Sequence, residues 1–144
     1  MRALLDVNIV IALLDPAHSL HNKAHAWWDK HASLGWASCP ISENGVVRIM
    51  AGPSYSSQTS FSAAEIVHLL ETFVSKSDHE FWLDDISLRD EKIFAIDRIL
   101  RSHQLTDLYL LALAAKHDGR LVTFDQGISL SAVPIAKPEN LLVL

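Results

Sequence analysis

LTDLYLLALAAKHDGRLVTFDQGI, residues 105–128, is the stretch of this sequence that decides the fold. Thr106 is a residue type that caps helices, and the apolar run after it predicts a buried helix over 107–117 that a glycine ends. A short apolar strand is expected over 121–124, and it leads directly into Asp125. A helix followed so closely by a strand is typical of α/β folds with a parallel sheet.

The same alternation extends toward both ends of the chain. A first strand is expected over 3–5, and the apolar run over 7–14 predicts a helix buried behind it. We expect further helices over 20–32, 42–50, 63–74 and 90–101, and further short strands over 36–41, 81–83 and 141–144. The pattern predicts a three-layer α/β/α sandwich around a mostly parallel sheet, as a single domain over 1–144.

Composition limits the class of protein. The chain has 144 residues, of which 49% are hydrophobic and 20% charged, so it can bury a core and is not disordered. No apolar run reaches the roughly 18–20 residues that span a bilayer, and no signal pattern opens the chain. We therefore expect a cytoplasmic protein without a membrane association. Cys39 is the only cysteine, which excludes an internal disulfide and a cysteine-rich zinc site.

Four carboxylates fall where such a sheet places its functional site, beyond the carboxyl ends of the strands. Asp6 and Asp125 directly follow predicted strands, and Glu43 and Asp107 begin predicted helices. In each of these two helices, apolar residues stand three and four positions after the acid. The acid therefore lies on the same face of the helix, which we expect to face the interior. All four can therefore converge at one edge of the sheet. Because buried carboxylates repel one another and lose hydration, they require protons or cations.

The chemistry of these side chains points to a divalent cation. Four carboxylates without sulfur suit Mg²⁺ or Mn²⁺, ions that promote phosphodiester hydrolysis by polarising the phosphate and activating water. We therefore expect catalytic and metal-binding roles for all four acids. Asn8 and Thr123 each lie two residues from one of them and could orient it or hydrogen-bond a water of the site. Arg48, about one turn after Glu43, is a candidate phosphate contact.

Taken singly, most of these acids have an ordinary structural interpretation. Asp107 and Glu43 could merely interact with a helix dipole, and Asp125 could start a turn. Asp6 is harder to explain in this way, because an acid within an apolar run is costly unless it is used. The joint pattern therefore favours a functional site.

The net charge of −5 is unusual for a protein that binds nucleic acid, since such proteins usually present a basic face. Without the four acids, however, 13 acidic residues remain against 12 Lys and Arg. The negative excess is therefore concentrated in one predicted site, which cations would neutralise.

Three segments of the sequence resemble the acidic motifs of PIN domains, most closely those of the VapC-like toxins of bacterial toxin–antitoxin pairs. They are LLDVNIVIALL (4–14), ISENGVVRI (41–49) and the stretch 105–128, and they occur in the family's order across essentially the whole chain. The resemblance implies a PIN-like fold, a magnesium- or manganese-dependent endoribonuclease, a VapB-like antitoxin partner and a frequent homodimer. It assigns the acidic roles to Asp6, Glu43, Asp107 and Asp125. Val7 departs from the pattern, because many relatives carry Thr there.

Two alternatives stay open. An aspartate-dependent phosphoryl-transfer domain also gathers acids around Mg²⁺, but such a site usually has a second acid where Asn8 stands. A catalytically inactive PIN-like module could instead bind RNA or protein. The presence of all four acids argues against the inactive module, because a dead site has no electrostatic reason to keep them.

Overall fold

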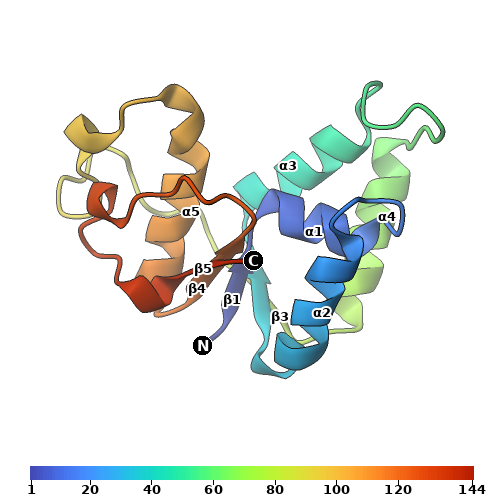
Figure 1. Ribbon diagram of the computed structural model, residues 1–144, viewed down its shortest axis with the longest axis horizontal. Helices are drawn as coiled ribbons and strands as arrows, with labels where there is room; N and C mark the ends of the chain where they lie inside the picture. The colour runs from blue at the N-terminus through green and yellow to red at the C-terminus, as the bar shows by residue number, and fades with distance from the viewer.

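Five short parallel strands form the centre of the molecule (Figure 1). The computed structural model describes all residues 1–144. The strands are β1 (Ala3–Leu5), β2 (Trp36–Ser38), β3 (His79–Phe81), β4 (Arg120–Thr123) and β5 (Leu141–Val143), in the order β3-β2-β1-β4-β5. The helices are α1 (Val7–Leu14), α2 (His21–His31), α3 (Pro40–Met50), α4 (Ala63–Ser75) and α5 (Leu105–Lys116). All neighbouring strands are parallel, so their carboxyl ends meet at one edge.

Side chains of β1 alternate between two hydrophobic cores, one on each face of the sheet. Ala3 and Leu5 pack with residues of α1 to α4, whereas Leu4 packs with residues of α5. Figure 1 shows the same division, with α5 on one side of the sheet and the other four helices on the opposite side. The expected three-layer α/β/α sandwich around a parallel sheet is confirmed.

The helix α3 begins earlier than the sequence predicts. We expected a strand over 36–41 and a helix from 42, but the strand ends at Ser38 and the helix begins at Pro40. Proline suits the first helical position because its ring fixes φ and its missing N–H needs no partner there. Glu43 is consequently the fourth residue of the helix and lies within its first turn.

The helix expected over 90–101 does not form. One helical turn starts at Asp90, whose carbonyl accepts a hydrogen bond from the N–H of Phe94 at 2.9 Å. The next N–H, that of Ala95, donates instead to the carbonyl of Ala132 at 3.0 Å. Because this tertiary hydrogen bond replaces the helical one, the chain turns away, and only a short 3₁₀ turn over Ile96–Arg98 follows.

Smaller differences concern element boundaries. The edge strand covers His79–Phe81 and not 81–83, and α5 is preceded by a 3₁₀ turn, so that Thr106 lies within its first turn instead of capping it. The remaining elements match the expected ranges to within two residues. None of the helices combines the length and the apolar character that crossing a membrane would require.

Candidate active site

Three aspartates meet at the carboxyl edge of the sheet. Because β1 and β4 pair with Leu5 opposite Val122, the residues that follow them lie side by side. Asp6 Oδ2 accepts a hydrogen bond from the Thr123 hydroxyl at 2.7 Å, and that hydroxyl oxygen also accepts the N–H of Asp125 at 3.0 Å. Thr123 therefore joins the two strand-end acids, as its spacing from Asp125 suggested.

Asp6 is held rigidly at the start of α1. Its second oxygen, Oδ1, accepts the N–H of Val7 at 2.7 Å, which caps the helix, and only 5% of the residue is exposed. Burial raises the pKa of the Asp6 carboxyl, and the negative charge of Asp125 raises it further, while the two hydrogen bonds lower it. Such an acid in the core of a small protein is costly and indicates a use.

Asp107, in the first turn of α5, completes the group. Burial, the charge of Asp6 and a contact with Asp125 together raise the pKa of the Asp107 carboxyl to about 7. No lysine or arginine forms an ion pair with any of these three acids. The protein thus concentrates negative charge at this edge and supplies no cation of its own to balance it.

A cleft of about 540 Å³ opens beside two of the aspartates. Asn8 lies on the exposed side of α1 and Arg48 on the exposed side of α3, and both face this cleft, as does Thr106. The lining residues are Asp6, Val7, Asn8, Pro40, Ile41, Asn44, Gly45, Arg48, Ile49, Asp84, Thr106 and Asp107. Gly45 makes room there, because a Cβ atom at this position would lie 2.8 Å from Cγ2 of Val7. The cleft is large enough for part of a polymeric substrate.

Glu43 is not brought into this group. Its Oε1 accepts a hydrogen bond from the Ser38 hydroxyl at 2.5 Å, and the Ser38 oxygen in turn contacts Nε2 of His79 at 2.7 Å. Burial lowers the pKa of the His79 imidazole. Because the Ser38 hydroxyl donates to Glu43, its oxygen is available to accept a hydrogen bond from the His79 ring. Glu43 lies in the first turn of α3, and the Ser38 that it binds is the last residue of β2.

Asp84 lines the cleft although sequence reasoning did not select it. Its Oδ2 accepts the N–H of Ile41 at 3.1 Å and so stabilises the start of α3, and its Oδ1 is buried without a partner. The residue follows β3 at the same edge of the sheet as Asp6 follows β1. The signal that could have found it was present in the sequence, because Asp84 directly follows the strand expected over 81–83.

The donor set fits a hard divalent cation. Three carboxylates at one edge, without sulfur and without a protein cation, match the oxygen ligands that Mg²⁺ and Mn²⁺ prefer. Several of their oxygens are engaged in hydrogen bonds, including Asp125 Oδ1 with the N–H of Gly127 at 2.7 Å. Accordingly, no three acidic or imidazole side chains stand at ready-made ligand spacing. Binding of one ion by all three would therefore require side-chain rotations.

Comparison with known proteins identifies the family. Residues 3–134 match the model of the PIN domain. Ribonuclease VapC44 of Mycobacterium tuberculosis is 47% identical over 144 residues, which cover 100% of both chains. Ribonuclease VapC39 of the same organism is 42% identical over 132 residues, covering 92% of this chain and 94% of its own.

A solved structure has the same fold. A chain in the crystal structure of VapBC2 from Rickettsia felis, bound to a DNA fragment from their promoter, superimposes with a TM-score of 0.62. The match covers 100% of this chain and 99% of that chain at 16% sequence identity. With the family model and full-length relatives in agreement, the chain belongs to the PIN domain family and, within it, to the VapC-like ribonucleases.

Proposed function

We propose that this protein is a metal-dependent endoribonuclease and the toxin of a VapBC-type toxin–antitoxin pair. The observation that carries the proposal is the meeting of Asp6, Asp107 and Asp125 beside a cleft, with no protein cation to balance them. The family and the names of the full-length relatives support RNA as the substrate. The proposed RNA substrate and the single unpaired Cys39 both fit the cytoplasm.

Asp6, Asp107 and Asp125 would hold Mg²⁺ or Mn²⁺. When bound, such an ion supplies the positive charge that polarises a phosphodiester and makes water a better nucleophile. Thr123 fixes the positions of Asp6 and Asp125 through its hydroxyl, so it would orient both ligands. Asn8, exposed at the cleft, would hydrogen-bond water or a phosphate oxygen there, and Arg48 would bind a phosphate of the substrate.

The role of Glu43 as a fourth acidic metal ligand stays a prediction. Its carboxylate would have to leave the Ser38 hydroxyl to join the aspartates. If it remains on Ser38, Glu43→Gln should lower cleavage by less than about tenfold, because it would remove no ligand. A loss as large as that of Asp107→Asn would instead show that Glu43 joins the site when metal is bound.

Cleavage of RNA by the purified protein tests the proposal. We expect cutting within the chain that depends on Mg²⁺ or Mn²⁺ and stops in EDTA. The products should carry 5′-phosphate and 3′-hydroxyl ends, because water activated in this site does not need the 2′-hydroxyl of RNA. Products with 2′,3′-cyclic phosphate would reject the mechanism. Stable RNA binding without any cleavage, in the presence of either metal, would instead support an inactive PIN-like module.

The proposed partners are a VapB-like antitoxin and a second copy of the chain. An arginine from an antitoxin could pair with the aspartates and compete with the metal, since its planar guanidinium suits carboxylates. Inhibition by the antitoxin should then weaken as the Mn²⁺ concentration rises. Inhibition that does not depend on the metal concentration would mean that the antitoxin acts only by covering the surface of the protein. Light scattering on the isolated protein would show whether it is a dimer.

A further inference from the structure

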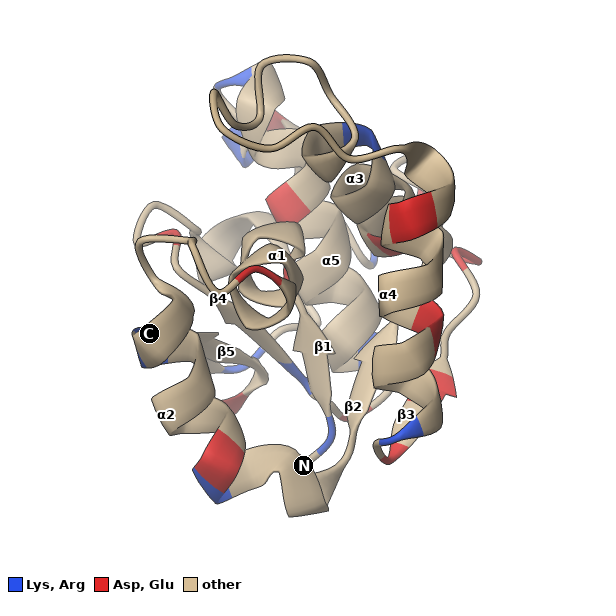
Figure 2. Ribbon diagram, turned by 90° about the vertical axis from the view of Figure 1, so that its right-hand side faces the viewer, with Lys and Arg blue, Asp and Glu red and all other residues tan.

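A polyanionic substrate must be held by positive charge, although this protein carries a net charge of −5. Figure 2 shows basic segments in blue at the upper end of the molecule, the end toward which β1 runs. The ion pairs of the structure use other basic residues, namely Arg2 with Asp78 and Glu80, and Lys116 with Asp85. Arg48 and Arg98, which lie near the aspartates, form no ion pair within the protein.

Arg98 lies beside two of the aspartates, outside the main cleft. A second, small crevice is lined by Arg98 together with Asp107, Asp125 and Gly127. Asp107 also lines the main cleft, in which Arg48 lies. Asp107 thus borders both openings, and one exposed arginine lines each of them.

The segment that carries Arg98 is fixed and not a free loop. Phe94 is buried, with 1% exposed, and its ring stacks near Tyr109 of α5 at a centroid distance of 6.2 Å. The N–H of Ala95 donates to Ala132, which anchors the turn to the chain that follows Asp125. Arg98 Nη1 donates to the carbonyl of Ser131 at 3.2 Å, so the guanidinium is held in place while the residue stays exposed.

We propose that Arg98 binds a phosphate of the RNA at the second opening beside Asp107, separate from the cleft that Arg48 lines, an inference that rests on the proposed function. The single-stranded backbone then crosses the three aspartates with a basic side chain at each opening. An arginine suits this task because its remaining N–H groups bind phosphate oxygens while one of them holds Ser131. The contact involves phosphate, so it confers affinity and register without base preference.

Binding of a labelled single-stranded RNA of about 20 nucleotides tests the assignment. Asp6→Asn serves as the background, in Mg²⁺, because it should keep the RNA intact. Arg98→Gln removes the charge but keeps a donor for Ser131, and Arg98→Lys keeps the charge. Arg101→Gln is the matched control, since Arg101 is also exposed, lies three residues away and lines neither opening.

We expect Arg98→Gln to weaken RNA binding about tenfold and to reduce the slope of log K against log salt by about 0.7, the value for one phosphate contact on a single strand. Arg98→Lys should recover most of the affinity, and Arg101→Gln should change it less than about twofold. In the otherwise wild-type enzyme, Arg98→Gln should raise KM about tenfold and change kcat little.

Two results would overturn the inference. They differ in whether the proposed function also fails. If Arg98→Gln binds RNA with the affinity and salt slope of Arg101→Gln, Arg98 serves only to hold Ser131, and the proposed function stands. If the wild-type protein cleaves no RNA in either metal and the Asp6→Asn protein binds none, the proposed function fails together with this inference.

Discussion

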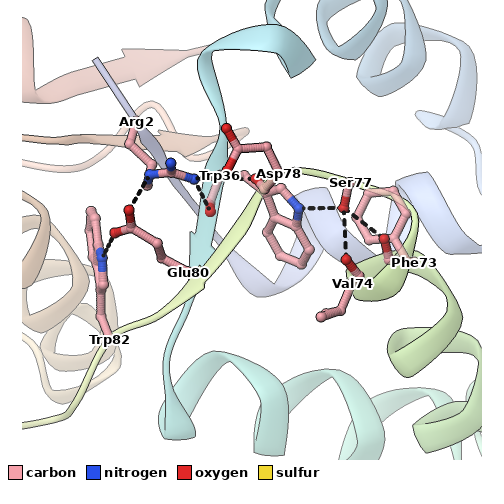
Figure 3. Close-up of polar contacts among 8 residues, drawn as sticks. All are labelled: Arg2, Trp36, Phe73, Val74, Ser77, Asp78, Glu80 and Trp82. Carbon is pink, nitrogen blue, oxygen red and sulfur yellow. Dashed lines mark hydrogen bonds and ion pairs between the residues drawn. The ribbon is translucent and has the colours of Figure 1, made fainter.

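The two ends of the sheet use acidic residues in opposite ways. At the amino end, Arg2 Nη1 lies 3.0 Å from Asp78 Oδ1 and its Nε lies 3.1 Å from Glu80 Oε1. Figure 3 shows this network, in which Trp82 also donates to Glu80 and Trp36 donates to Ser77. At the carboxyl end, Asp107 contacts Asp125, the charge of Asp6 acts on both, and none of the three forms an ion pair with a lysine or arginine.

This contrast separates structural acids from acids available for function. The acids at the amino end are exposed, each forms an ion pair with Arg2, and they lie at the edge strand β3, so folding alone explains them. The aspartates at the carboxyl end are more deeply buried on average and raise the free energy of the fold through mutual repulsion. Repulsion of this kind is tolerated in a folded protein where binding of a ligand compensates for it.

The largest effect should come from removing one carboxylate at the carboxyl end. We expect Asp6→Asn and Asp107→Asn each to lower RNA cleavage by about 10³-fold or more, because each removes a proposed metal ligand and its charge. Glu80→Gln, which removes an acid from the amino end, should cleave like the wild type. Initial rates in Mg²⁺ and Mn²⁺ give the comparison. Wild-type rates from either aspartate variant would remove the distinction between the two ends.

The next effect concerns stability and pH in the absence of metal. The pKa of Asp107 rises from an ordinary 3.8 to about 7 on folding, so between these values the folded state binds more protons than the unfolded state. The free energy of unfolding should therefore fall as pH rises from about 4 to 7. The Asp107→Asn variant lacks this pH-dependent loss. Its free energy of unfolding at pH 8 should exceed that of the wild type by about 2 kcal/mol, a value reduced from the full pKa shift because Asp107 is partly exposed to solvent.

Urea unfolding at several pH values measures this difference. Mn²⁺ should stabilise the wild type at pH 8 and should stabilise Asp107→Asn much less, because ligand binding to the folded state adds to its stability. An Asp107→Asn protein whose stability falls with pH as steeply as that of the wild type would contradict the assignment of the repulsion to this residue.

The carboxyl-end part of this contrast could be predicted from the sequence. The strand ends at Asp6 and Asp125 followed from short apolar runs, and the start of α5 near Asp107 followed from the long apolar run after it. These are local patterns, and hydrophobic periodicity with parallel topology is enough to bring the three acids to one edge. Thr123 followed from its spacing to Asp125.

The remainder depends on contacts that local patterns do not contain. The sequence does not show that Ala95 donates to Ala132, which ends the helix expected over 90–101 and brings Arg98 toward the aspartates. Nor does it show that Asp84 accepts the N–H of Ile41 at the start of α3, where Glu43 is turned toward Ser38. In each case a hydrogen bond between distant segments decided a local conformation.

A smaller effect is expected at the amino end. Arg2 donates to the carbonyl of Trp36 at 3.1 Å and to that of Asp78 at 3.2 Å, in addition to its ion pairs. Arg2→Met keeps much of the apolar stem but leaves these acceptors to water, so we expect a loss of about 1–2 kcal/mol in unfolding free energy. Chemical denaturation measures it. RNA cleavage should be unchanged at a temperature where the variant is folded, and reduced cleavage would couple the two ends.

The smallest effect should come from Glu80 itself. Its carboxylate contacts Arg2 and the indole N–H of Trp82, yet the side chain is 53% exposed, so water screens the pair. Glu80→Gln keeps an acceptor for Trp82 and should cost about 0.5 kcal/mol or less. A double-mutant cycle with Arg2→Met should give a coupling of similar size that declines in 1 M salt. A coupling well above 1 kcal/mol would mean that this exposed pair stabilises the edge strand β3 strongly. The acids of the amino end would then matter to stability as much as those of the carboxyl end, although with the opposite sign.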